Sequence, residues 1–83
     1  MYDILFSKTA EKQFLKLEKT VQERIKSALE RVRVRPEKHF LRLVGSELHR
    51  LRVGNYRVIA DIKHKNLLIH VIEVGHRKNM YKN

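Results

Sequence analysis

The segment RLRVGNYRVI, residues 50–59, decides the fold because it predicts a β-hairpin whose strands meet at a two-residue turn. Gly54 and Asn55 tolerate the positive φ that such a tight turn requires, and apolar residues alternate with charged or polar ones on both sides of them. Counting outward from the turn predicts the cross-strand pairs Val53 with Tyr56, Arg52 with Arg57, Leu51 with Val58 and Arg50 with Ile59.

This pairing predicts a sheet with one cationic and one apolar face, because successive side chains in a strand point to opposite faces. The cationic face carries Arg50, Arg52 and Arg57, and the apolar face carries Leu51, Val53, Tyr56 and Val58. Like charges directly opposite one another destabilise a strand pair, and a bound anion would relieve that repulsion. The alternative is a solvated face that Asp61 or Glu73 neutralises, and the sequence does not fix the face on which Glu73 lies.

Two helices are predicted upstream of the hairpin. Residues 2–6 read as a strand that ends at Ser7, which can cap a helix with apolar positions Ala10, Phe14 and Leu17. Thr20-Val21-Gln22-Glu23 has the spacing of a capping box and predicts the start of the second helix, which must end near Arg35, before Pro36. The core positions of the second helix are Val21, Ile25, Ala28, Leu29 and Val32.

Period-two patterns after Pro36 predict further strands at residues 40–44, 48–53, 56–63 and 67–74, with a turn at residues 63–66. The fold class predicted is α+β: an N-terminal strand, a two-helix hairpin, then a mostly antiparallel sheet of three to four further strands.

The composition is that of one small, basic domain covering residues 1–83. The chain has 83 residues, a formal net charge of +10 and no cysteine, so neither a disulfide framework nor a cysteine zinc site can form. No stretch has the length of a signal peptide's apolar core or of a membrane span, so we expect a cytoplasmic protein. The charge indicates an anionic partner, for which nucleic acid, an acidic protein and a membrane surface are all admissible.

The C-terminal residues His76, Arg77 and Tyr81 are of the kinds used to cleave RNA without a metal ion. Attack of a 2′-hydroxyl on phosphorus needs a base, an acid and cations that stabilise the transition-state charge. His76 or Tyr81 could move protons, while Arg77 with Arg57 could hold the phosphate. The alternatives are a surface role for His76 and a ring packed over the sheet edge for Tyr81. The histidine spacing predicts no metal site.

The order of these elements, with residues 51–59, then Val74-Gly75-His76-Arg77 and Tyr81, resembles the RelE/ParE superfamily of toxins from prokaryotic toxin–antitoxin pairs. The resemblance covers essentially the whole chain. It implies a toxin that a RelB-like antitoxin neutralises and, on the RelE branch, a metal-independent endoribonuclease that needs no cofactor. Such an mRNA interferase cleaves mRNA in the ribosomal A site and thereby inhibits translation.

By this resemblance, Arg57 and Arg77 would stabilise the phosphate, and Tyr81 would orient or deprotonate the 2′-hydroxyl. The RelE branch carries two strand lysines where this chain has Leu48 and Arg50, so His76 becomes the substitute for proton transfer. The expected RNA-binding positions are Arg50, Arg52, Lys78 and Lys82. The ParE branch offers the alternative of a non-catalytic inhibitor of DNA gyrase. A general basic nucleic-acid-binding module explains the charge but not the C-terminal residues.

Overall fold

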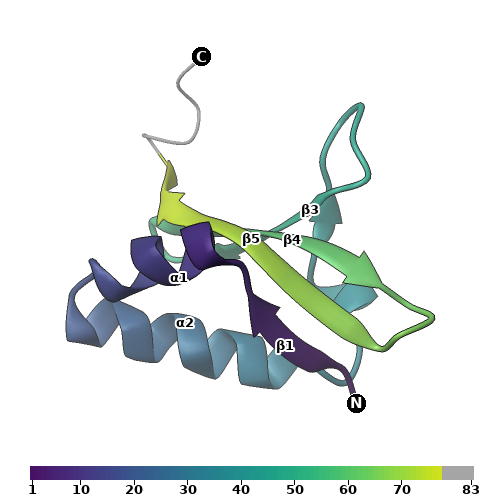
Figure 1. Ribbon diagram of the computed structural model, residues 1–83, viewed down its shortest axis with the longest axis horizontal. Helices are drawn as coiled ribbons and strands as arrows, with labels where there is room; N and C mark the ends of the chain where they lie inside the picture. Colours follow the sequence, from purple (N-terminus) through teal and green to yellow (C-terminus); the bar gives the residue numbers. More distant parts are fainter. Residues whose placement is uncertain (78–83) are drawn as a thin grey trace.

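The computed structural model describes residues 1–77 and places two helices together on one side of a five-stranded sheet (Figure 1). In chain order the elements are β1 (Asp3–Phe6), α1 (Lys8–Leu15), α2 (Lys19–Val32), a 3-10 turn (Pro36–Lys38), β2 (Leu41–Arg42), β3 (His49–Val53), β4 (Tyr56–Lys63) and β5 (Leu68–His76). The predicted α+β class is confirmed.

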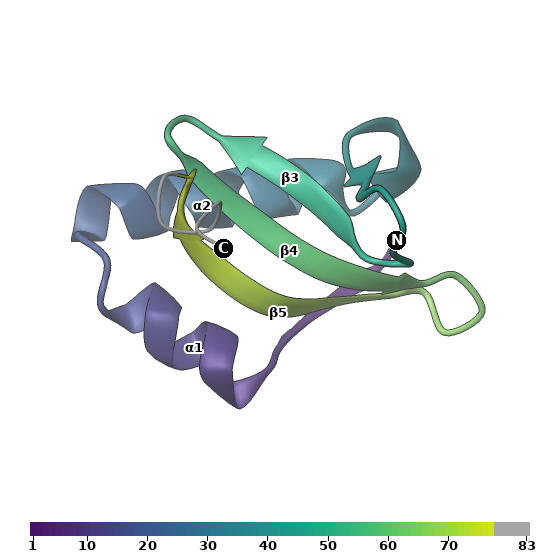
Figure 2. The ribbon, with the colours of Figure 1, turned by 90° about the horizontal axis from the view of Figure 1, so that it is seen from above.

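The strand order is β1-β5-β4-β3-β2, so the first strand lies at one edge and pairs with the last (Figure 2). β1 is parallel to β5, and the other neighbours are antiparallel. The hairpin register predicted from the Gly54-Asn55 turn is confirmed, with Arg52 opposite Arg57. Gly54 has a φ of +61°, as a two-residue hairpin turn requires.

The two helices begin differently from one another. Ser7 caps α1 as predicted, and its side-chain oxygen accepts a hydrogen bond from the Ala10 amide at 3.0 Å. The capping-box prediction for α2 is wrong, because the N-cap is Glu18 rather than Thr20. The Glu18 carbonyl accepts from the amide of Gln22, and the Gln22 side chain donates back to the carbonyl of Leu17 at 2.8 Å. Gln22 therefore closes the link between the helices instead of capping its own helix.

The core lies between the helices and the face of the sheet that turns toward them. From the helices it contains Ala10, Ile25, Ala28, Leu29 and Val32, and from the sheet Leu51, Val58, Ala60, Ile62, Ile69, Val71 and Val74. The predicted stripe of α2 is thus the buried one, with Val21 at its margin. Within residues 1–77, no helix covers the opposite face of β3 and β4.

The strand predicted at residues 40–44 is shorter than expected, since only Leu41–Arg42 pair with β3. Phe40 leaves the sheet: its amide donates to the Pro36 carbonyl at 2.9 Å, and its side chain is buried in the core. The free energy of burying this ring outweighs one more strand pair. Within residues 1–77, the outer edge of β3 consequently has a neighbouring strand only at His49 and Arg50.

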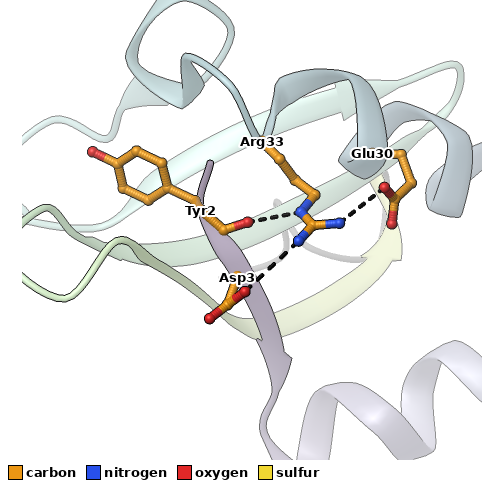
Figure 3. A network of polar contacts seen from close by, with 4 residues as sticks. All are labelled: Tyr2, Asp3, Glu30 and Arg33. Atoms are coloured by element: carbon orange, nitrogen blue, oxygen red, sulfur yellow. Dashed lines mark hydrogen bonds and ion pairs between the residues drawn. The ribbon is translucent and has the colours of Figure 1, made fainter.

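A polar network fastens β1 to the end of α2 (Figure 3). Arg33 donates from Nε to the Tyr2 carbonyl at 2.7 Å, and its Nη1 pairs with Glu30 Oε1 at 3.0 Å. The Nη2 atom of Arg33 forms a longer ion pair with Asp3 Oδ1 at 3.7 Å. The Tyr2 amide donates in turn to the Arg33 carbonyl. These contacts hold the edge strand in place where the sheet meets the helices.

Candidate functional site

Arg57 is the centre of the cationic face. It lies in β4 with only 6% of its surface exposed, whereas its cross-strand neighbour Arg52 is exposed. Ile59, the next residue on the same face, is also buried and belongs to no part of the main core. Arg57 is therefore held in a sheltered position on the face of the sheet that lies away from the helices.

The electrostatics of this position are unfavourable for a cation. Burial is the largest cause that lowers the pKa of the Arg57 guanidinium. The positive charges of Arg50, Arg77 and Arg52 lower the same pKa further. Holding a cation in a sheltered position among three other cations costs free energy. An anion with several oxygens, such as a phosphate, would offset this cost.

Arg77 reaches this cluster from the end of β5. Its amide donates to the Asn55 carbonyl at 3.0 Å, so the hairpin turn fixes the start of the C-terminal segment. The Nε atom of Arg77 is buried and has no hydrogen-bond acceptor within residues 1–77. The tertiary structure thus brings Arg77 close to Arg57, although the two residues are twenty positions apart in the sequence.

His76 lies on the other face of the sheet from Arg57. The register pairs His76 with Tyr56, and the two rings meet edge to face with centroids 5.2 Å apart. Gly75 is the residue opposite Arg57, and it leaves that position without a side chain. The structure therefore brings Arg50, Arg52, Arg57 and Arg77 together and places His76 apart from them.

The acids considered from the sequence take different positions. Glu73 lies opposite Ile59, which puts it on the cationic face, and it is exposed. The Asp61 carboxylate pairs with Lys63 at 3.0 Å. Three of the candidate residues, Lys78, Tyr81 and Lys82, lie outside the described residues.

Two basic residues of α2, Arg24 and Arg31, are not among the site residues predicted from the sequence. Arg24 and Arg31 stand seven residues apart, hence on one side of the helix, and the fold sets this side beside β3. The Arg24 guanidinium lies next to Gly54 of the hairpin turn. The seven-residue spacing of Arg24 and Arg31 is the sequence feature that could have identified them as a pair. It becomes informative only when the position of α2 beside β3 is known.

Within residues 1–77 no group of His, Asp and Glu side chains is arranged to hold a metal ion. The same part of the chain contains no helix with the length and apolarity needed to cross a membrane. What the described cluster offers chemically is a set of fixed guanidinium groups around one sheltered position.

A family model described as ParE toxin of type II toxin–antitoxin system, parDE, matches residues 4–81. No curated protein sequence matches the chain.

Solved structures with a similar fold are toxins of the RelE type. The isolated E. coli RelE toxin is 27% identical with a TM-score of 0.79, over 92% of this chain and 84% of that one. The toxin in the E. coli RelBE toxin–antitoxin complex is 30% identical with a TM-score of 0.78, over 92% and 96%. The RelBE2 toxin–antitoxin complex of Mycobacterium tuberculosis has a TM-score of 0.84 over 92% and 98%, and at 22% identity it shows likeness of fold alone.

Proposed function

This chain belongs to the ParE toxin family of type II toxin–antitoxin systems, within the RelE/ParE superfamily, and from that premise we propose that it is a ribosome-dependent endoribonuclease. It would cleave mRNA in the A site by attack of a 2′-hydroxyl on the adjacent phosphorus, and so inhibit translation. The observation that carries the proposal is the sheltered Arg57 with Arg50, Arg52 and Arg77 around it. Such a cluster stabilises the extra negative charge of a phosphorane-like transition state.

The arginines divide the work by position. Arg57 and Arg77 are the proposed catalytic cations, because Arg57 is sheltered and the Arg77 Nε is buried nearby. Arg50 and the exposed Arg52 would bind the RNA backbone on the approach to this point, together with Lys78 and Lys82 of the C-terminal segment. Arginine suits phosphate because its planar fork meets two oxygens at once and stays charged at physiological pH.

Proton transfer is proposed for Tyr81 first and for His76 second. Tyr81 follows Arg77 by four residues and carries a hydroxyl that can orient or deprotonate the 2′-hydroxyl. The His76 ring packs edge-on against Tyr56 on the face away from Arg57, which is why His76 is the second candidate.

The partners proposed are the ribosome with its mRNA and a RelB-like antitoxin. Some of the structures similar to this chain are toxin–antitoxin complexes, including that of Pyrococcus horikoshii RelE with RelB. The charge of +10 on a chain of 83 residues supports an anionic partner in each case.

The test adds the purified chain to programmed ribosomes with an empty A site and maps the mRNA ends by primer extension. Arg77→Ala and Tyr81→Phe run beside it, with Arg35→Ala as the matched control because Arg35 is exposed and lies outside the cluster. Cuts within the A-site codon that Arg77→Ala abolishes, and that the control retains, support the proposal. Intact mRNA at saturating protein refutes it.

A second candidate function is inhibition of DNA gyrase without catalysis. The observation in its favour is that the matching family model is that of ParE, while the RelE-branch strand lysines are replaced by Leu48 and Arg50. A supercoiling assay with purified gyrase distinguishes the two: inhibition there, with mRNA left intact on the ribosome, assigns the chain to this second function.

A further inference from the structure

The last strand, β5, contains a β-bulge immediately before Glu73. The register of β4 with β5 shifts between Ile59 and Ala60, so that Ile72 is an extra residue in β5 without a cross-strand partner. If Ile72 were paired, Glu73 would lie opposite Val58 and point into the core, because successive side chains alternate between faces. With the bulge, Glu73 instead lies opposite Ile59 on the cationic face, where it is exposed. The bulge thus moves one acid of β5 onto the face that carries the arginines.

Two side chains from the N-terminal part of the chain hold the bulge at the outer edge of β5. The hydroxyl of Ser7, the N-cap of α1, donates to the carbonyl of Ile72 at 3.3 Å, and the side-chain oxygen of Gln13 accepts from the amide of Val74 at 2.7 Å. β1 pairs with β5 only as far as Val71, so these contacts satisfy backbone groups that no strand reaches within residues 1–77. The conformation that exposes Glu73 is therefore fixed by specific contacts.

The strand register makes Glu73 a diagonal neighbour of Arg57. Two rows of residues cross β3, β4 and β5 on the cationic face: Arg52, Arg57 and Gly75 in one, and Arg50, Ile59 and Glu73 in the next. Diagonal neighbours lie about 7–8 Å apart, which is within reach of long side chains. A phosphate bound to Arg57 beside Gly75 would therefore leave room for one ribose hydroxyl between itself and the Glu73 carboxylate.

We propose that Glu73 is the general base of the RNA cleavage and accepts the proton of the attacking 2′-hydroxyl. The inference rests on the proposed function, whose chemistry needs a proton acceptor close to the phosphate. The 2′-oxygen forms a bond to phosphorus as its proton passes to a carboxylate oxygen of Glu73, and the bond from phosphorus to the 5′-oxygen breaks. The proton transfer proposed for Tyr81 then runs to the leaving 5′-oxygen, because a neutral phenol can donate. The products are a 2′,3′-cyclic phosphate and a 5′-hydroxyl.

The competing role for Glu73 is to neutralise the cationic face. A neutralising acid would form an ion pair with one of the arginines, and among the side chains of residues 1–77 Glu73 forms none. The two roles also differ in their consequences. Loss of a neutralising acid strengthens anion binding and leaves the chemical step unchanged, whereas loss of a base slows the chemical step itself.

The test measures single-turnover cleavage of A-site mRNA on programmed ribosomes at saturating protein, with Glu73→Gln beside the wild type. Glutamine keeps the shape of the side chain but cannot act as the base. We expect the cleavage rate to fall about 100-fold or more. Binding to ribosomes whose mRNA carries 2′-deoxyribose at the cleavage site should be unchanged or tighter.

The matched control is Asp61→Asn, which removes the same charge from the same face. Asp61 pairs with Lys63 at 3.0 Å and lies two residues beyond Ile59 on β4, further from Arg57. This variant should therefore keep the wild-type cleavage rate. Circular dichroism confirms that each variant is folded.

An mRNA with sulfur in place of the leaving 5′-oxygen separates the base from the acid. A thiolate leaves without protonation, so a variant that lacks the acid recovers on this substrate, whereas a variant that lacks the base does not. We expect the loss in Glu73→Gln to persist, and Tyr81→Phe to recover most of its rate.

The assignment of Glu73 is overturned if Glu73→Gln cleaves as fast as the wild type, or if the sulfur substrate restores its rate. Tighter binding with an unchanged cleavage rate would identify Glu73 as a neutralising acid instead. Each of these results leaves the proposed function in place, because the wild type still cleaves. Intact mRNA with the wild type refutes the proposed function, and the role of Glu73 with it.

Discussion

Replacing Arg57 with leucine should remove the response of the chain to added anions. Arg57 is almost fully buried and faces Arg52 directly, and like charges in that position cost up to about 1 kcal/mol. Because the pKa of Arg57 is lowered rather than raised, the folded state disfavours its charged form, and this cost is present throughout the physiological pH range. An apolar side chain of similar reach removes the repulsion and the desolvation together with the charge that an anion would meet.

The anion response can be calculated from linkage. For a dissociation constant of about 1 mM, about 10 mM pyrophosphate stabilises the native chain by about 1.4 kcal/mol. For a domain of this size that free energy corresponds to a rise in Tm of about 6–11 °C. Leucine at position 57 takes the central cation out of the cluster, and we expect the rise to fall to the small effect of general screening.

Thermal unfolding of both proteins, with and without pyrophosphate and with sodium chloride added to hold the ionic strength constant, measures these quantities. Arg35→Leu is the control, since it removes one exposed arginine outside the cluster and should keep the full response. If Arg57→Leu responds to pyrophosphate as strongly as the wild type does, then Arg57 is not the anion site, and the reasoning from its burial and neighbours is wrong.

Three further substitutions test the fold that positions the cluster, each by chemical denaturation. Gly54→Ala should lower the free energy of unfolding by about 1–2 kcal/mol, because Gly54 has a φ of +61° and a Cβ would meet only ordinary contacts there; unchanged stability would mean that the turn relaxes at no cost. Ser7→Ala should cost about 1 kcal/mol by removing the oxygen that accepts from the Ala10 amide, and a neutral result would show that water caps α1 equally well. Ile25→Ala should cost about 2–5 kcal/mol, since Ile25 is fully buried between α2 and the sheet; a loss well below that range would place this side chain outside the core.

Local patterns in the sequence determined the secondary structure and the β3–β4 register. A two-residue turn leaves one way to pair its flanking strands, so the turn alone predicts that Arg50, Arg52 and Arg57 share one face. The helix stripe of α2 follows from the 3.6-residue period alone. Local patterns gave wrong predictions at two places: the N-cap of α2 at Thr20, and the strand at Phe40. There, contacts with other parts of the chain were stronger than the local preference.

Only the tertiary structure decided which residues surround Arg57 and how deeply it is buried. The parallel pairing of β1 with β5 and the strand order join segments far apart in the chain, and no local period encodes such contacts. The bond from the Arg77 amide to Asn55 places the second proposed catalytic arginine, and the strand register sets His76 on the other face. The edge of β3 at Arg52 likewise has no paired strand within residues 1–77 because Phe40 turns into the core. That turn depends on the space between the helices and the sheet, which no local pattern encodes. The sequence by itself thus determined the elements and their faces, whereas packing decided which of those faces meet and which stay open to a partner.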